Sequence, residues 1–525
     1  MHSMDNPAFV VELEKERGSN EKVTHSERAH TFEEAITLAQ VGRFHYLLLL
    51  ICGTCFMSVM VEIMGISYIM PSMECDLPST ISEQGLLASS GFLGVVLSSH
   101  AMGFLADTWG RVRTLRFALV FSFLATIVSA FSVHIWMLIV FRFLNGFFIS
   151  GCQACVFSLC GEFHGNRTRV RYVTLLSGFM TIALVYLPSA ATGILPLRIE
   201  NVVFGMPFSS WRILLIVNSS LSLLALAGLM TLPETPKYIL VQGNPDGALE
   251  ILRYIYQKNT GLPGSEYPVH RIELESGGAN LNDIHSFRDA LKMIWSQTAP
   301  LFHKERCLHT LNICVVVFVI YFVSQGSFMW FPTILNELVA KNGQGLQVCQ
   351  IIGEMQDVGR RTSNVCSGEH DHFTFQVLII MGVAFTIFYV FFAFTIDRIG
   401  KKQLLVGWML IAIGCSVAIH WTSNFAVAVI ELTLVMAVAN CGGIVNTMSI
   451  EFFPTNINAM GMCFILMVGR LGAVAGSNIV GQFLFNNCDI VFWAFGALIC
   501  LIACLGLFLP ERNRNAAPTP KGLEN

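Results

Sequence analysis

Two related stretches decide the fold of this 525-residue chain. Residues 103–111 read Gly-Phe-Leu-Ala-Asp-Thr-Trp-Gly-Arg, and residues 393–401, which lie 290 positions later, read Ala-Phe-Thr-Ile-Asp-Arg-Ile-Gly-Lys. A second pair of landmarks, Gly161-Glu162-Phe163 and Ile450-Glu451-Phe452, is separated by 289 positions. Two unrelated landmarks with nearly the same offset indicate that the chain contains a duplicated half.

The composition places both halves in a membrane. Hydrophobic residues make up 54% of the chain and charged residues 13%, whereas a soluble protein carries about 25% charged residues. The apolar residues form runs of about twenty, the length that spans a bilayer as a helix. We predict an all-α membrane protein of twelve transmembrane helices in two six-helix pseudo-repeats. The expected spans are 45–71, 83–106, 113–132, 135–161, 171–196, 211–232, 307–337, 372–396, 402–421, 424–451, 458–485 and 489–509.

The polar segments complete the expected organisation. Residues 1–44 form an N-terminal segment with an amphipathic helix around Phe32 and Ile36, and 45–232 form the first half. Residues 233–306 form a central loop with short helices, 307–509 the second half, and 510–525 a tail. Lys and Arg concentrate in the loops on the side of the termini, so the positive-inside rule places both termini in the cytoplasm. A net charge of −3 gives no sign of nucleic-acid binding.

Four motifs resemble those of the major facilitator superfamily. They are residues 103–113 with Thr108 in place of the usual Arg, Arg142-Phe-Leu-Asn-Gly146, Pro233-Glu-Thr-Pro-Lys-Tyr238, and Glu451-Phe-Phe-Pro-Thr455. Within that superfamily, Gly42-Arg-Phe-His-Tyr46 and Val61-Glu62 look most like the synaptic vesicle glycoprotein 2 and related-protein group, which resembles sugar porters and organic-ion transporters. The resemblance implies a midplane cavity lined by helices 1, 4, 7 and 10.

The resemblance also implies a cytoplasmic gate. In the first half, Arg111 and Arg113 would pair with Glu162, while an Asp at the end of one helix faces the positive N-terminus of another. The alternative is ordinary anchoring at the membrane surface. The expected gate residues of both halves are Asp107, Arg111, Arg113, Glu162, Asp397, Arg398, Lys401 and Glu451.

Glu62 is the most informative single residue. A carboxylate in the hydrocarbon costs about 2.5–3.5 kcal/mol even on lenient insertion scales, so Glu62 should face a cavity or a partner. It belongs to a mostly small or polar stripe that suits a water-filled cavity or a close helix contact. Three interpretations remain open: a binding group for a proton or a cationic substrate, a structural ion pair with Arg142 at similar depth, or harmless snorkelling.

Other polar residues in the expected spans are candidates for substrate contacts or for interhelical hydrogen bonds. These are Gln153 in the fourth span, Tyr321, Gln325 and Trp330 in the seventh, and Asn440 and Asn446 in the tenth. Glu431 and Arg470 add a further acid and base within the membrane.

The cysteines of the outer loops predict a disulfide. Cys349 and Cys366 share one loop, which makes their pairing the preferred arrangement; a Cys75–Cys488 bridge is the alternative. Residues 369–372 resemble a metal cluster by composition only, and a surface loop is the simpler interpretation. We expect no metal and no cofactor.

The sequence thus predicts a secondary active transporter of a small organic solute that works by alternating access, with a proton as the candidate coupling ion. An organic cation or another metabolite would be the substrate. The alternative is a vesicle-membrane adaptor that no longer transports. An enzyme is not expected, because no nucleophile constellation or ATPase signature is present. The expected partners are the solute, the proton and the bilayer, for a monomer in the plasma membrane or a secretory or synaptic vesicle membrane.

Overall fold

The computed structural model describes residues 30–197, 202–203, 206–273, 299–340, 346–353, 372–452 and 458–509. Its N-terminal segment contains β1 (His30–Thr31) and α2 (Phe32–Leu38). Its first half contains α3 (Arg43–Met64), α4 (Ile66–Met73), α5 (Ile81–Trp109), α6 (Arg111–Ala130), α7 (Ile135–Glu162), α8 (Asn166–Ser177), α9 (Phe179–Ile194), β2 (Val202–Val203), β3 (Met206–Pro207) and α10 (Ser210–Met230). The central segment contains α11 (Pro236–Val241), α12 (Pro245–Thr260), η1 (Gly264–Glu266), β4 (Ile272–Glu273) and η3 (Ala299–Phe302). The second half contains α14 (Lys304–Ala340), α16 (His372–Ile399), α17 (Lys401–Ala418), α18 (Phe425–Met436), α19 (Ala439–Phe452), α20 (Asn458–Asn486) and α21 (Cys488–Leu507).

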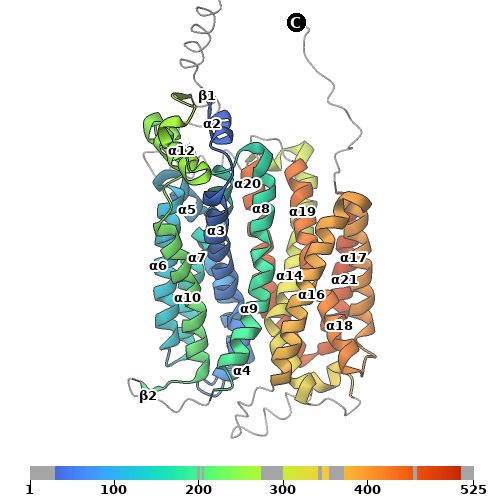
Figure 1. Ribbon diagram of the computed structural model, residues 1–525. Helices are drawn as coiled ribbons and strands as arrows, with labels where there is room; N and C mark the ends of the chain where they lie inside the picture. The colour runs from blue at the N-terminus through green and yellow to red at the C-terminus, as the bar shows by residue number, and fades with distance from the viewer. Residues whose placement is uncertain are drawn as a thin grey trace, which may run out of the picture.

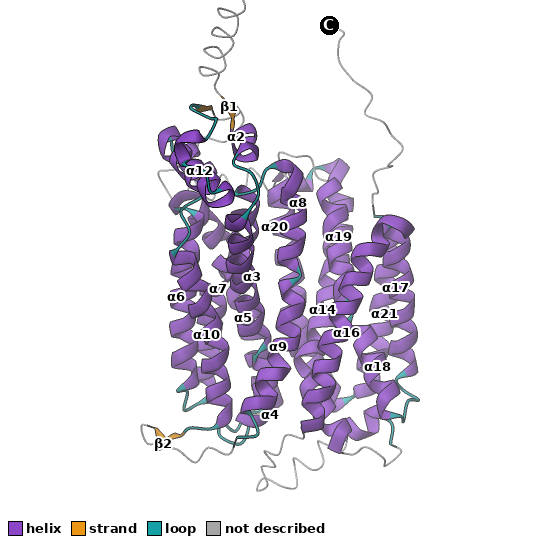
Figure 2. Cartoon of the chain, in the orientation of Figure 1, coloured by secondary structure: helices purple, strands orange, loops and turns teal. Residues whose placement is uncertain are grey.

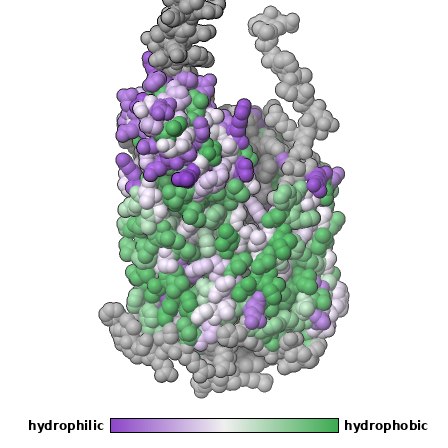
Figure 3. All heavy atoms as spheres, in the orientation of Figure 1, coloured by the Kyte–Doolittle hydropathy of each residue, from purple (hydrophilic) through white to green (hydrophobic). Residues whose placement is uncertain are grey.

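Twelve helices among the described residues are long and apolar enough to cross a membrane, which confirms the predicted fold class. Three of the twelve spans consist of two consecutive helices: α3 with α4, α8 with α9, and α18 with α19. On the face shown in Figure 3, apolar side chains form a band along the bundle, and polar residues gather at one end. This surface is the one that a helical protein needs in a bilayer, because lipid cannot satisfy exposed polar groups.

The helices form two bundles that lie side by side (Figure 1). The elements α3 to α10 lie mainly to the left and α14 to α21 mainly to the right (Figures 1 and 2). The bundles meet where α5 packs on α20, α9 on α16, and α4 on α14. We call the end that carries α2 and α12 the α12 end, and the opposite end, with β2 and α4, the β2 end.

A small cap covers the first half at the α12 end (Figure 1). The helix expected around Phe32 and Ile36 is present as α2, and Thr31 and Glu34 form a capping box at its start. Strand β1 pairs in parallel with β4, so the N-terminal segment is joined to the central segment. Asn259 at the end of α12 accepts a hydrogen bond from the Phe44 backbone N–H at 3.0 Å, which ties the cap to the first membrane helix.

Candidate functional site

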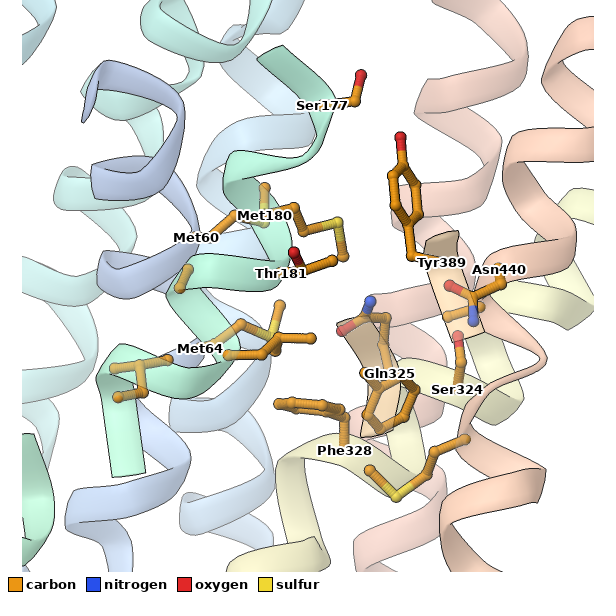
Figure 4. Close-up of a pocket in the computed structure, with 16 residues that line it drawn as sticks. Met60, Met64, Ser177, Met180, Thr181, Ser324, Gln325, Phe328, Tyr389 and Asn440 are labelled. Carbon is orange, nitrogen blue, oxygen red and sulfur yellow. The ribbon is translucent and has the colours of Figure 1, made fainter. Parts of the chain in front are cut away.

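A pocket lies between the two halves, and its walls come from helices of both (Figure 4). Its free space is about 50 Å³, room for a few water molecules rather than for an organic solute. Most of the lining is apolar, with amide and hydroxyl groups from Gln325, Asn440, Thr181 and Tyr389. Figure 4 shows Met60, Met64 and Met180 on one side and Gln325, Tyr389 and Asn440 on the other.

The pocket lies where three membrane helices are interrupted. The breaks fall at Gly65 between α3 and α4, at Gly178 between α8 and α9, and after Met436 between α18 and α19. Shorter i→i−3 hydrogen bonds appear at each break, for example from Tyr68 N to Gly65 O and from Thr181 N to Gly178 O. Such short stretches within a helix often mark a hinge. Three of the membrane helices in the pocket wall can therefore bend at the level of the pocket.

Glu62 and Arg142 form the expected ion pair, inside the first half. Arg142 Nη1 donates to Glu62 Oε2 at 3.2 Å, and the two side chains are 3% and 1% exposed, respectively. Thr126 and Asn145 also donate to Oε2, at 2.8 and 3.2 Å. The Oε1 atom is buried and lacks a hydrogen-bond partner among the described residues. One carboxylate oxygen thus receives all of these hydrogen bonds while the other is left without one.

The ion pair and the pocket lie on opposite faces of α3. Met60 and Met64 line the pocket, and Glu62, two residues from each, points about 200° away at 100° per residue. Glu62 therefore points toward Thr126 of α6 and Arg142 of α7, rather than into the cavity. None of the described lining residues comes from α7, so the expectation that the fourth helix lines the cavity is wrong for this pocket.

The other predicted substrate residues separate into two groups. Gln325 and Asn440 line the pocket, and both have a buried side-chain atom without a described partner, Oε1 and Nδ2. Trp330 is fully buried and donates to the Ser477 carbonyl at 2.8 Å, so its indole serves the packing of α14 on α20. Tyr321 packs beside Gly469 of α20. Gln153 and Asn446 are half-buried and do not line the pocket.

Several pocket residues were not predicted from the sequence. Thr181, Phe328, Phe385 and Tyr389 line the pocket from α9, α14 and α16. Hydroxyl and aromatic side chains are common in packed membrane helices, so their sequence carries no signal that distinguishes them. The position of Phe328, three residues after Gln325 on the same helix face, is the one clue that the sequence offered.

The gate residues of the first half form a connected network at the α12 end. Arg111 contacts Asp107 at 2.9 Å and Glu162 at 3.1 Å. The other oxygen of Glu162 accepts from the Thr235 hydroxyl at 2.7 Å. Arg111, rather than Arg113, thus forms the ion pair with Glu162. The network links the ends of α5, α6 and α7 to the segment that precedes α11.

Glu234, which was not among the predicted gate residues, also belongs to this network. Its carboxylate accepts from the Val112 N–H at 3.0 Å, at the start of α6, where the helix dipole favours a negative charge. Tyr238 donates to the Thr108 carbonyl at 2.9 Å. Burial and the nearby Glu234 carboxylate raise the pKa of the Tyr238 hydroxyl, so it keeps the proton that it donates. The motif 233–238 contained the signal for both residues.

The gate of the second half is only partly described. Arg398 is exposed and Lys401 half-buried at the junction of α16 and α17. The side chains of Asp397 and Glu451 lie outside the described set, so the pairing of Arg398 and Lys401 with Glu451 and the gate role of Asp397 stay predictions.

The disulfide expected between Cys349 and Cys366 is wrong. Cys349 is bonded to Cys488, 139 residues away at the start of α21. This bond also excludes the alternative Cys75–Cys488 bridge. Cys366 itself lies outside the described residues, as do positions 369–371 of the metal-like cluster. Proximity in sequence was misleading because the fold brings the start of α21 beside residues 346–353.

Known proteins resemble this chain along most of its length. The model of the Major Facilitator Superfamily matches residues 50–477. The niacin transporter NiaP of Acinetobacter baylyi is 24% identical over 491 residues, which cover 92% of this chain and 98% of NiaP. Synaptic vesicle glycoprotein 2C of Mus musculus is 28% identical over 344 residues, which cover 62% of this chain and 47% of that protein. The match therefore spans about half the length of the synaptic vesicle relative.

Solved structures show the same fold. The xylose transporter XylE from E. coli, in a partially occluded inward-open conformation, has a TM-score of 0.62 and 15% identity, and the match covers 89% of this chain and 100% of XylE. The nucleoside transporter NupG has a TM-score of 0.58 and 12% identity, with 89% and 100% coverage.

Proposed function

Because the chain belongs to the major facilitator superfamily, we propose that it carries a small organic solute across the membrane by alternating access. The observation that supports this proposal most is the pocket between the halves, bounded by α3, α9, α14 and α16 at the level of the helix breaks. The halves are in contact at the β2 end, where α4 packs on α14 (Figure 1). In this proposal the solute enters from the α12 end, and the positive-inside distribution makes that end cytoplasmic.

The lining supports an uncharged or planar polar solute more than an organic cation. The described lining residues include no Asp, Glu, Lys or Arg. Glu62, which the sequence offered as a binding group for a cationic substrate, points away from the pocket. Phe328 and Phe385 can contact a ring, while the unpartnered amide atoms of Gln325 and Asn440 can bind polar groups. The similarity to a niacin transporter makes pyridine carboxylates and their amides the first compounds to test.

Glu62 is the proposed site of the coupling proton. Its Oε1 atom is free to take a proton, while Oε2 keeps the hydrogen bonds from Thr126 and Asn145. A carboxylate that can be charged or neutral next to a fixed Arg is what proton coupling requires. The structural ion pair is the competing interpretation, and it predicts that Glu62 stays ionised throughout the cycle.

A thermal-shift screen of the purified protein against a solute panel tests the proposal. A ligand at 100 times its Kd stabilises the folded state by about 2.7 kcal/mol. We expect one class of compounds to raise the Tm of the wild type and to have a much smaller effect on Gln325→Ala and Asn440→Ala. Gln153→Ala, a half-buried amide outside the pocket, is the matched control and should respond like the wild type.

The small pocket and the synaptic vesicle relatives support a second candidate, an adaptor that does not transport. A pocket with about 50 Å³ of free space needs no solute to complete the packing of the two halves. An adaptor would bind its partner through the cap of α2 and α12. Two results together would favour the adaptor. No solute in the panel would raise the Tm of the folded protein, and partner binding would be lost when the exposed face of α12 is altered.

A further inference from the structure

An apolar groove lies between α14 and α20, away from the pocket. Its volume is about 320 Å³, and its walls are almost entirely apolar. The lining residues are Phe302, Thr310, Leu311, Cys314, Val315, Phe318, Phe464 and Val468. The rings of Phe302 and Phe464 meet edge to face, with centroids 5.4 Å apart, at its α12 end.

The groove opens to the outside of the bundle. On α20, Arg470 contacts Ser99 of the first half, which marks the face that points to the other bundle. Phe464 and Val468 precede Arg470 by six and two residues, so they lie about 120–160° around the helix from that face. Leu311 on the groove wall is 57% exposed. Because the groove residues on α14 belong to the predicted span 307–337, lipid rather than water covers the groove.

A lysine precedes the groove residues on the same face of α14. Lys304, Leu308, Leu311 and Val315 follow one another at helical spacing, so they form one stripe along α14. Lys304 is exposed at the α12 end of the stripe, where the membrane surface lies, and Leu308 is 74% exposed below it. A lysine at the membrane surface beside an apolar groove complements the negative headgroup and the acyl chain of an anionic phospholipid. Basic positions between membrane helices on the cytoplasmic side are known to bind anionic headgroups.

We propose that this groove binds an anionic glycerophospholipid of the leaflet at the α12 end. One acyl chain lies between α14 and α20 along Leu311 and Val468, and the net negative headgroup lies beside Lys304. The site is separate from the solute pocket, but α14 lines both, since Gln325 and Phe328 belong to the same helix. Bound lipid therefore supports the position of the helix that carries the solute-binding amide.

Native mass spectrometry of the delipidated full-length protein tests the site. The protein is titrated with phosphatidylserine or phosphatidylcholine, and the lipid retained is measured. We expect the wild type to bind phosphatidylserine more tightly than phosphatidylcholine. Lys304→Gln should lower this preference about fivefold, which is the contribution of one Lys near an anionic membrane surface. Lys237→Gln, which removes an exposed charge at the same end, should leave the preference unchanged.

Filling the groove tests the acyl chain separately. Val468→Phe from α20 and Cys314→Phe from α14 should each lower retention of both lipids at least tenfold, whereas Leu224→Phe, on the exposed surface of α10, should not. One variant changes each wall of the groove, so that the test still gives a result if one of the two variants misfolds. Equal retention by wild type, groove variants and control would mean an adventitious annular lipid only and would overturn the proposal. Lipid binding is measured without solute, so its failure is distinct from a failure of the transport proposal.

Discussion

Replacing Glu62 with Gln tests whether the buried pair is ionised. In the wild type, Glu62 Oε2 lies 3.2 Å from Arg142 Nη1, and both side chains are almost fully buried. The substitution keeps the shape and a carbonyl acceptor but leaves a buried guanidinium without a counter-charge. Breaking a buried pair by removing one partner costs about 3–5 kcal/mol, and we expect the lower end of this range because Thr126 and Asn145 can still donate to the Gln oxygen. Arg142→Met alone should cost a similar amount.

The double variant Glu62→Gln/Arg142→Met isolates the interaction. Replacing both charges of a buried pair is often close to neutral, so the double variant should be more stable than either single variant. Unfolding in detergent by SDS titration, followed by Trp fluorescence, measures the three changes, and their non-additivity gives the coupling energy. Glu431→Gln is the matched control, because Glu431 is also buried within the membrane and accepts from the Thr422 hydroxyl rather than from a cation. A Glu62→Gln variant as stable as the wild type would refute the ion pair and indicate that Glu62 is already neutral.

Three other features give separate expectations. Glu234→Ala should lower the free energy of unfolding by about 1 kcal/mol, because the start of α6 loses its capping carboxylate; a Glu250→Ala variant on the exposed face of α12 should not change the SDS midpoint. Cys349→Ser should cost about 2–4 kcal/mol, and a reducing agent should lower the Tm of the wild type but not that of the variant. Gly382→Leu should separate α9 from α16, because its Cβ would lie 2.6 Å from a backbone carbonyl. Faster hydrogen exchange in both helices would report the opening, and Gly407→Leu, where the added Cβ meets nothing within 4 Å, should leave exchange unchanged.

The twelve spans could be predicted because they depend on one property that is local in sequence. About twenty apolar residues in a row are enough to span the bilayer, whatever packs against them. The Glu62–Arg142 pair was predictable as one of the open alternatives for a similar reason. An intramembrane charge is costly, and Arg142 was the opposite charge at similar depth in the same half. In both cases the cost of placing polar or charged groups in lipid restricts the possible structures before the packing neighbours are known.

The face of α3 that lines the pocket could not be predicted, because small and polar residues serve two purposes. Ser58, Glu62 and Gly65 would suit a water-filled cavity, but the same small or polar residues also allow close helix packing. Met60 and Met64 look like lipid-facing or core residues in the sequence, yet they line the pocket. The partner of Cys349 was missed for a related reason: it depends on which helix end lies beside residues 346–353, and no local pattern encodes that.

The two faces of α3 suggest how a proton could act on the solute without touching it. Glu62 on one face bonds to α6 and α7, while Met60 and Met64 on the other face border the pocket. A helix packed on both sides cannot change one contact and keep the other, because the interior is close-packed. Protonation of Glu62 weakens its attraction to Arg142, and the break at Gly65 lets the end of α3 shift relative to α4. Under the proposed cycle, α3 is therefore the element whose position both the proton and the solute bias, as coupling between two sites requires.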